Sequence, residues 1–295
     1  MKGKSLFKIL LYLSLGFFIY YLYRLDYLVL GQLDFRPAPL VLSLLLLFAG
    51  FVGSALSWGF LLRKHHIRVS GAQAVVSHGL YVFAKYIPGK LWVVVGRAGL
   101  VQALTGSSLR ELSFISLKEQ FIYILLGLLL SVVPVYLLDG AGWYLLILLL
   151  TILGLALMLF SPAVHRLGLY LLGRVFRKTM EIPVISLRDF VQASGVVLAY
   201  WLLWTAGFYL LLASVLGSLP LIAAFAFPLS VSYGVLALFM PGGIGVREGI
   251  ITAFLVLAGV ELEMAITLSV VSRLWFVAGE LFFFLLAVGL KWMRG

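Results

Sequence analysis

The chain has 295 residues, of which 63% are hydrophobic and only 11% are charged, against about 25% charged residues in soluble domains. This composition excludes a soluble globular domain, because too few polar residues remain to cover its surface. Leu-rich apolar runs recur along the chain, and each is long enough to cross about 30 Å of hydrocarbon as a helix. The runs are continuous rather than alternating, and a backbone in lipid must pair its own polar groups. They therefore predict an all-α integral membrane protein.

No sequence pattern indicates a soluble type of active site. The chain has no cysteine, which excludes disulfides and thiolate metal sites. It also lacks a Walker loop, a nucleophile elbow and any histidine–carboxylate spacing typical of metal enzymes. We therefore predict no catalytic residue, no metal and no cofactor, and an ATP-driven pump is excluded for the chain itself.

In chain order, the first apolar run extends from Leu6 to Tyr23 behind three lysines. No small-residue cleavage site follows it, so we expect an uncleaved anchor helix. Together with an outer loop, this helix makes an N-terminal unit of residues 1–38. Five further full spans are expected at Pro39–Leu62, Leu112–Leu138, Trp143–Phe160, Asp189–Leu216 and Met264–Leu290.

Two regions do not have the pattern of ordinary spans: the first interrupted region, residues 71–104, and the second, residues 219–258. Each contains two apolar stretches of half length that meet at a Pro-Gly turn. Proline ends a helix at the preceding residue, and glycine permits a sharp reversal. We predict two re-entrant helical hairpins beside six full spans. The alternative is that each region crosses fully, which gives eight or more spans. The predicted turn residues are Pro88, Gly89, Pro241, Gly242 and Gly243.

The distribution of charges predicts the orientation. With six spans and two hairpins, both termini lie on one face, and that face receives most of the basic residues, as cytoplasmic loops do. We therefore expect a multi-pass protein of the cell (cytoplasmic) membrane with cytoplasmic N- and C-termini. The net charge of +11 is then a topology signal, and no nucleic-acid partner is expected. The basic residues on the predicted cytoplasmic face are Lys2, Lys4, Lys8, Arg63, Lys64, Arg68, Arg110, Arg166, Arg174, Arg177, Lys178, Arg188, Lys291 and Arg294.

An internal repeat divides the chain. A shift of 153 residues places Pro88-Gly89 on Pro241-Gly242 and residues 41–62 on residues 194–215. The first half, residues 39–160, and the second half, residues 189–295, enter the membrane from opposite faces. Residues 161–188 form a basic amphipathic linker between them. Inverted-topology halves with broken helices are a recurrent plan in transporters; a purely structural duplication is the alternative.

Ionisable residues at membrane depth mark the predicted site. Each costs at least about 2.5–3.5 kcal/mol at a helix centre, so each faces protein or water. Six are basic and three acidic, and the positive excess suits a phosphate-bearing ligand. The alternative is that they only pair with one another, for example Glu119 with Arg273 and Glu248 with Arg97. Lys85 and Lys90 are expected to extend to the membrane surface. The nine residues are Lys85, Lys90, Arg97, Lys118, Glu119, Arg247, Glu248, Arg273 and Glu280.

Four motifs in this order resemble the lysylphosphatidylglycerol synthase transmembrane-region family: YIPGKLWVVVGRAGL (86–100), SLKEQ (116–120), MPGGIGVREG (240–249) and SRLWFVAGE (272–280). The similarity runs from about residue 40 to residue 290. In the multiple peptide resistance factor, the corresponding domain is regarded as a lipid flippase fused to a soluble aminoacyltransferase. No such transferase is present among these 295 residues, so lysyl transfer is not implied. The resemblance implies lipid translocation, and it points to the turn residues and to Arg97, Glu119, Arg247, Glu248, Arg273 and Glu280.

The sequence thus predicts a flippase that moves an anionic lipid or lipid-linked intermediate between leaflets by alternating access. Arg97, Arg247 and Arg273 would bind the phosphate, while Glu119, Glu248 and Glu280 would orient them or carry a proton. A second interpretation is a membrane subunit that recruits or regulates a lipid- or glycolipid-modifying enzyme. The third is an intramembrane transferase with Glu119 or Glu248 as its base. The expected partners are a membrane lipid and, in the second case, that enzyme; a homo-oligomer is compatible with all three.

Overall fold

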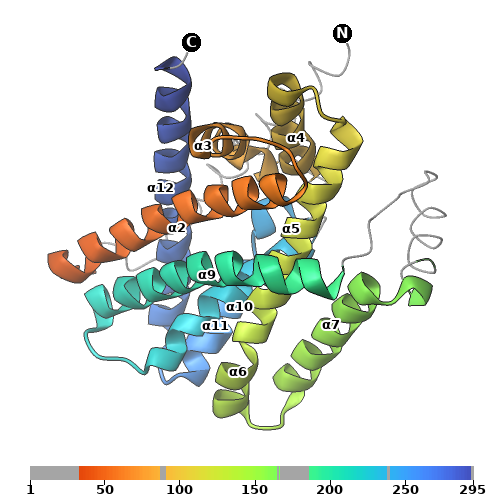
Figure 1. Cartoon of the computed structure of the whole chain (residues 1–295). Helices are drawn as coiled ribbons and strands as arrows, with labels where there is room; N and C mark the ends of the chain where they lie inside the picture. Colours follow the sequence, from red (N-terminus) through yellow and green to blue (C-terminus); the bar gives the residue numbers. More distant parts are fainter. Residues whose placement is uncertain (1–32, 87–90, 165, 167–185, 238–239, 294–295) are drawn as a thin grey trace.

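The computed structural model of the chain describes residues 33–86, 91–164, 166, 186–237 and 240–293 (Figure 1). Within this part all regular structure is helical. Five helices are long and apolar enough to cross a membrane, and their ends lie within three residues of the predicted ones. They confirm a multi-pass helical membrane protein. The anchor helix Leu6–Tyr23, the turn Pro88-Gly89 and most of the linker 161–188 lie outside the described residues.

The helices α2 (Pro37–Lys64) and α9 (Leu187–Leu216) lie side by side and antiparallel (Figure 1). The N–H of Arg36 donates to the carbonyl of Ser214 at 2.8 Å, which joins the start of α2 to the end of α9. Farther along, the hydroxyl of Ser43 donates to the carbonyl of Gly207 at 2.7 Å. A Cβ placed on Gly207 would lie 3.1 Å from the backbone carbonyl oxygen of Ser43. Small residues therefore permit close backbone contact, as in other membrane helix pairs.

The third long span consists of α5 (Leu109–Leu130) and α6 (Val132–Asp139). They meet at Ser131, whose hydroxyl donates to the carbonyl of Gly127 at 2.9 Å. Pro134 has no N–H to continue the ladder, which accounts for a break at this point. The next helix, α7 (Trp143–Phe160), packs on α5 and α6, yet only 11% of its residues are buried. Most of α7 therefore faces the surroundings of the protein, which for an apolar helix means lipid.

The last helix, α12 (Leu262–Trp292), packs on α2, on α11 and on the first interrupted region. Its Phe276 lies at the centre of an aromatic core, with ring centroids 5.0 Å from Phe51, 5.5 Å from Trp204 and 5.5 Å from Phe227. These rings come from α2, α9, α10 and α12. Because aromatic pairs at 4.5–7 Å add to the stability from area burial, this core fixes the helices that carry the charged residues.

Both interrupted regions consist of short helices, as predicted. The first contains α3 (Gly71–Gly79), the 3₁₀-helix η3 (Val82–Tyr86) and α4 (Leu91–Thr105). The second contains η4 (Leu221–Phe225), α10 (Ala226–Leu236), η5 (Pro241–Gly243) and α11 (Val246–Leu257). Helix α4, with 15 residues, is the longest of them. At 1.5 Å per residue it is about 22 Å long, less than the thickness of the hydrocarbon core.

Candidate functional site

All six residues predicted to bind the ligand are buried, although their side chains are charged. Such burial is costly unless each charge meets a partner. The structure sorts the six into two groups, one on α4 and α5 and the other on α11 and α12. Their exposed fractions are Arg97 3%, Glu119 4%, Arg247 5%, Glu248 8%, Arg273 2% and Glu280 0%.

The first group is the pair cluster, formed by Arg97 of α4 with Ser116 and Glu119 of α5. The Nη1 of Arg97 donates to Oε2 of Glu119 at 2.6 Å. Its Nε donates to the Ser116 hydroxyl at 2.5 Å, and its Nη2 to the Ser116 carbonyl at 2.9 Å. The guanidinium also lies 4.3 Å from the ring of Trp58. Every guanidinium nitrogen of Arg97 therefore has a partner within the protein.

These pairings correct the bridges expected from the sequence. Glu119 pairs with Arg97 rather than with Arg273, and Glu248 lies beside Arg273 rather than beside Arg97. The physical reason is adjacency, because α4 packs on α5 and α11 packs on α12. Each carboxylate thus meets the arginine of the neighbouring helix in its own half.

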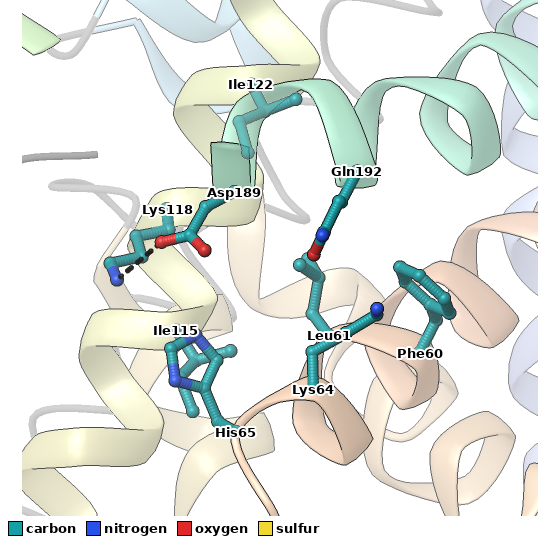
Figure 2. A pocket seen from close by; sticks show the side chains of 9 residues that line it. All are labelled: Phe60, Leu61, Lys64, His65, Ile115, Lys118, Ile122, Asp189 and Gln192. Atoms are coloured by element: carbon teal, nitrogen blue, oxygen red, sulfur yellow. Dashed lines mark ion pairs between the residues drawn. The ribbon is translucent and has the colours of Figure 1, made fainter. Parts of the chain in front are cut away.

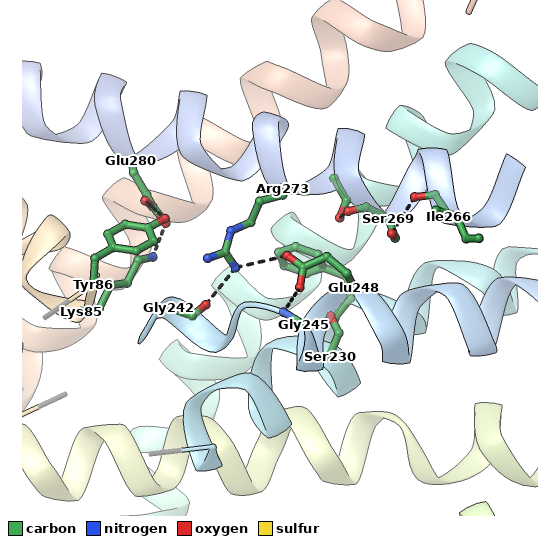
Figure 3. Close-up of polar contacts among 12 residues, drawn as sticks. Lys85, Tyr86, Ser230, Gly242, Gly245, Glu248, Ile266, Ser269, Arg273 and Glu280 are labelled. Carbon is green, nitrogen blue, oxygen red and sulfur yellow. Dashed lines mark hydrogen bonds and ion pairs between the residues drawn. The ribbon is translucent and has the colours of Figure 1, made fainter. Parts of the chain in front are cut away.

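The second group is the central cluster, which comprises Lys85, Tyr86, Arg247, Glu248, Arg273 and Glu280. Figure 3 shows Arg273 between the Gly242 turn and Glu248, with Glu280 farther along α12. The Nη1 of Arg273 donates to the carbonyl of Gly242 at 2.8 Å and lies 3.8 Å from Oε1 of Glu248. Oε2 of Glu248 in turn accepts the N–H of Gly245 at 2.7 Å. Thus Glu248 already occupies one of the backbone donors at the start of α11.

Glu280 has two partners from the first half of the chain. The ammonium of Lys85 forms an ion pair with Oε1, and the hydroxyl of Tyr86 donates to Oε2 at 2.8 Å. The prediction that Lys85 extends to the membrane surface is therefore wrong, since its head group points to a fully buried carboxylate. Tyr86 was not selected as a site residue. Its position in the sequence could have indicated a role, because Lys85 and Tyr86 lie just before Pro88-Gly89, the residues that align with Pro241-Gly242 in the repeat.

The turn of η5 lies against η3, so the two interrupted regions meet. Gly242 has φ +59°, and a Cβ there would lie 2.6 Å from the Tyr86 ring and 2.7 Å from Nη2 of Arg273. Gly243 has φ +71°, and its Cβ would lie 2.8 Å from Cα of Gly234. Both positions require glycine, because the backbone has a positive φ and because no room remains for a Cβ. The predicted turn at Gly242 and Gly243 is thus a tightly packed contact between the halves.

Arg247 has no ion pair among the described residues. Its guanidinium lies 4.8 Å from the ring of Phe276 and 5.7 Å from that of Phe227. Among the described residues, its Nε and Nη2 have no hydrogen-bond partner, and the same holds for Nε and Nη2 of Arg273. Cation–π contacts offset part of the burial cost, but an unpaired buried donor still costs about 1–3 kcal/mol. In this part of the chain, four buried guanidinium nitrogens therefore have hydrogen-bonding capacity that the protein does not satisfy.

The two clusters differ in charge. The pair cluster is neutral, with one arginine and one glutamate. In the central cluster, Lys85, Arg247 and Arg273 face Glu248 and Glu280, which leaves one positive charge at neutral pH. One unit of the predicted positive excess is thus located around α11 and α12, and this is where an anion would be attracted.

Lys118 lies at a different place, near the end of α2 (Figure 2). Its ammonium is 3.7 Å from Oδ2 of Asp189, the residue near the start of α9. Both side chains line a small cavity of about 20 Å³ together with Lys64 and His65, enough for about one water. Lys118 therefore ties α5 to α9 and takes no part in the central cluster; Lys90 lies outside the described residues.

We compared the chain with models of protein families, with curated proteins and with solved structures, and none of them matches.

Proposed function

We propose that this protein is a lipid flippase that carries an anionic, phosphate-bearing lipid between the leaflets by alternating access. The observation that carries the proposal is the pair of buried guanidinium groups of Arg247 and Arg273, four of whose nitrogens have no hydrogen-bond partner among the described residues. Guanidinium groups bind phosphate oxygens with well-defined, often bidentate geometry. A buried cationic group in a membrane protein marks a ligand or ion pathway by default.

In this proposal the phosphate binds between Arg247 and Arg273, in the central cluster with its net charge of +1. Glu248 holds Arg273 from the opposite side, and Glu280 holds Lys85 and Tyr86. The pair cluster has a different task. Because each guanidinium nitrogen of Arg97 already donates to Glu119 or Ser116, the pair cluster stabilises the packing of α4 on α5, and we assign it no contact with the ligand.

The helix boundaries support an inverted repeat. A shift of 153 residues carries the span Leu109–Asp139 onto 262–292, which are the bounds of α12. The same shift carries α2 onto 190–217, against 187–216 for α9. The packing is exchanged in the same way: α12 packs on α2 and α3, while α5 packs on α9 and α10. Such an exchange is expected of halves related by a pseudo-two-fold axis, as in many transporters.

The short helices support re-entrant hairpins, since none is long enough to cross the hydrocarbon core by itself. The end of η3 and the Gly242 turn would then meet near the membrane centre, where the Tyr86 ring lies beside Gly242. Because the six charged residues are at most 8% exposed, we assign this conformation to an occluded state, and opening toward either leaflet would expose Arg247 and Arg273. The cytoplasmic placement of both termini is part of the same proposal.

We extend the proposal to the family that the sequence resembles, the lysylphosphatidylglycerol synthase transmembrane-region proteins. The family comparison gives this no support. What supports it is that Tyr86, Arg247, Arg273 and Glu280, which lie in three separate motifs, form one cluster.

A flip assay in proteoliposomes tests the function. Phosphatidylglycerol with a fluorescent group on one chain is compared with phosphatidylcholine labelled in the same way, and dithionite quenches the outer leaflet. We expect faster flipping of phosphatidylglycerol, abolished by Arg247→Met. Lys118→Met is the matched control, because it also removes one cation but from the surface pair with Asp189, and it should flip at the wild-type rate.

Wild-type flipping by Arg247→Met would overturn the assignment of the phosphate site. Failure of the wild-type protein to flip any labelled lipid would overturn the transport proposal. It would favour the membrane-subunit interpretation, which predicts instead that a lipid-modifying enzyme copurifies with the protein.

A further inference from the structure

An apolar pocket of about 280 Å³ lies between α6 and α7 on one side and α10 and α11 on the other. Its wall on α7 includes Tyr144 and Ile147, which are 55% and 52% exposed, and its wall on α11 includes Leu257, which is 41% exposed. These residues belong to the lipid-facing surface of the molecule. The pocket is therefore accessible from the hydrocarbon of the bilayer.

The chemistry of the pocket favours hydrocarbon over water. Its lining is aliphatic and aromatic, and its hydroxyl groups come from Tyr144 and Tyr233. The hydroxyl of Tyr233 lies 3.1 Å from that of Thr151 and is thereby satisfied. A buried water needs two to four polar partners, which this lining does not supply. An apolar cavity of about 150 Å³ holds a benzene molecule, so this pocket has room for about ten or eleven carbon atoms.

Helix α11 connects the pocket to the central cluster. Gly249, Ile250, Ala253, Phe254 and Leu257 line the pocket, and their spacing places them on one side of the helix. Arg247 lies in the first turn of the same helix, two residues before Gly249. Two residues correspond to about 3 Å along the helix axis. A lipid whose phosphate binds at Arg247 therefore has the start of the pocket within reach of its chains.

We propose that this pocket is a chain-binding subsite, which holds about ten carbons of one hydrocarbon chain of the lipid whose phosphate binds at Arg247 and Arg273. This inference rests on the proposed function. It adds that the substrate is recognised at two places, by its phosphate in the central cluster and by an acyl or prenyl chain between α7 and α11. A phosphate compound without a long hydrocarbon chain would then lack one of these two binding contacts.

Gly249 provides the variant that tests this subsite. It is exposed, and nothing lies within 4 Å of a Cβ placed on it, so its side of the pocket is open. Leucine there would extend into the pocket without a clash, and it also has a higher helix propensity than glycine. Gly154 of α7 is the matched control. It is also a helical glycine with no atom within 4 Å of a Cβ, and it does not line the pocket.

The experiment measures chain binding directly. The wild-type protein, Gly249→Leu and Gly154→Leu are reconstituted with phosphatidylglycerol that carries a diazirine in the middle of one chain. After irradiation, mass spectrometry locates the adducts. We expect adducts concentrated on the α7 and α11 residues of the pocket, reduced several-fold by Gly249→Leu and unchanged by Gly154→Leu.

Even labelling of all lipid-facing helices, or pocket labelling that Gly249→Leu does not reduce, would overturn the subsite. The two proposals also fail separately. Localised labelling without flipping would retain the subsite and overturn the transport function. Flipping that depends on Arg247 without localised labelling would retain the function and overturn the subsite.

Discussion

The hydroxyl of Tyr86 donates a hydrogen bond of 2.8 Å to Oε2 of Glu280, across 194 positions of sequence. Lys85 binds the other oxygen of the same carboxylate. Glu280 is fully buried on α12, so these two residues supply partners that water cannot. The short helix η3 of the first half is in this way attached to the last helix of the second half.

Removal of the Tyr86 hydroxyl and removal of the Lys85 ammonium should destabilise the protein by different amounts. Tyr86→Phe removes one hydrogen bond to a charged group and should cost about 2 kcal/mol. Lys85→Met leaves a buried carboxylate without its counter-ion and should cost about 3–5 kcal/mol. Thermal unfolding in detergent measures both. The double variant Lys85→Met/Glu280→Gln should recover part of the loss; a double variant no more stable than Lys85→Met would contradict the pairing.

The two kinds of buried arginine should respond in opposite ways. Arg97→Met exposes Glu119 to an apolar environment without a partner and should cost about 3–5 kcal/mol, while Arg97→Met/Glu119→Met should restore much of it. Arg247→Met removes a cation that has no ion pair within the described part of the chain, so the unfolding temperature of this variant should equal or exceed that of the wild type. Melting curves of the variants in one detergent provide the comparison. Equal destabilisation by Arg97→Met and Arg247→Met would show that both arginines are structural.

The turn at η5 should tolerate a methyl group at one glycine and not at another. Gly245 has φ +83° with nothing within 4 Å of a Cβ, so Gly245→Ala should cost only the conformational strain, about 1–2 kcal/mol. Gly242→Ala carries a similar strain and also forces Tyr86 and Arg273 apart, so its unfolding temperature should be clearly lower. Melting curves in the same detergent test this prediction. Equal unfolding temperatures of Gly242→Ala and Gly245→Ala would refute the close contact of Gly242 with Tyr86 and Arg273.

The end of α2 should make stability depend on pH. Burial lowers the pKa of His65 below its ordinary value of 6.5, and the nearby Lys118 ammonium lowers it further; Asp189 and Glu111 oppose this, and His66 adds to it. The folded protein therefore binds this proton more weakly than the unfolded chain does. The resulting stability is present above about pH 6.5 and is lost as the pH falls through the lowered pKa.

We accordingly expect the unfolding temperature to fall between pH 7.5 and pH 5.5, and to fall less in His65→Gln, which cannot take up that proton. His66→Gln is the neighbouring control, because it changes an exposed histidine beside the same loop. An identical pH dependence in wild type and His65→Gln would exclude His65 as the source.

The membrane-spanning helices could be predicted from the sequence because a continuous apolar run is a local pattern. The apolar run of α7 begins after Gly142 and ends before Ser161-Pro162, so the predicted Trp143–Phe160 and the observed helix have the same ends. The interruption at Pro241 was also predictable, since proline removes an N–H and the glycines that follow it permit positive φ; Pro88 lies outside the described residues. Burial of the charges at Arg97, Arg247 and Arg273 followed from their position within apolar segments.

The pairing of these charges could not be read from the sequence, because it depends on which helices become neighbours. The sequence suggested a pairing of Glu119 with Arg273, yet α4 places Arg97 beside Glu119. Lys85 lay close enough to the end of an apolar stretch to suggest a surface position. Its pairing with Glu280 follows from the contact of η3 with α12, which no local pattern in the sequence encodes.

The contact at Gly242 has a consequence for movement. Tyr86 belongs to the first half and Arg273 to the second, and the Gly242 turn fills the space between them without a side chain to compress. A displacement of η3 therefore acts directly on the Gly242 turn, and the reverse is also true. In the alternating access that we propose, these two segments would have to move together, and a passage open to both faces of the membrane at once would require this contact to separate completely.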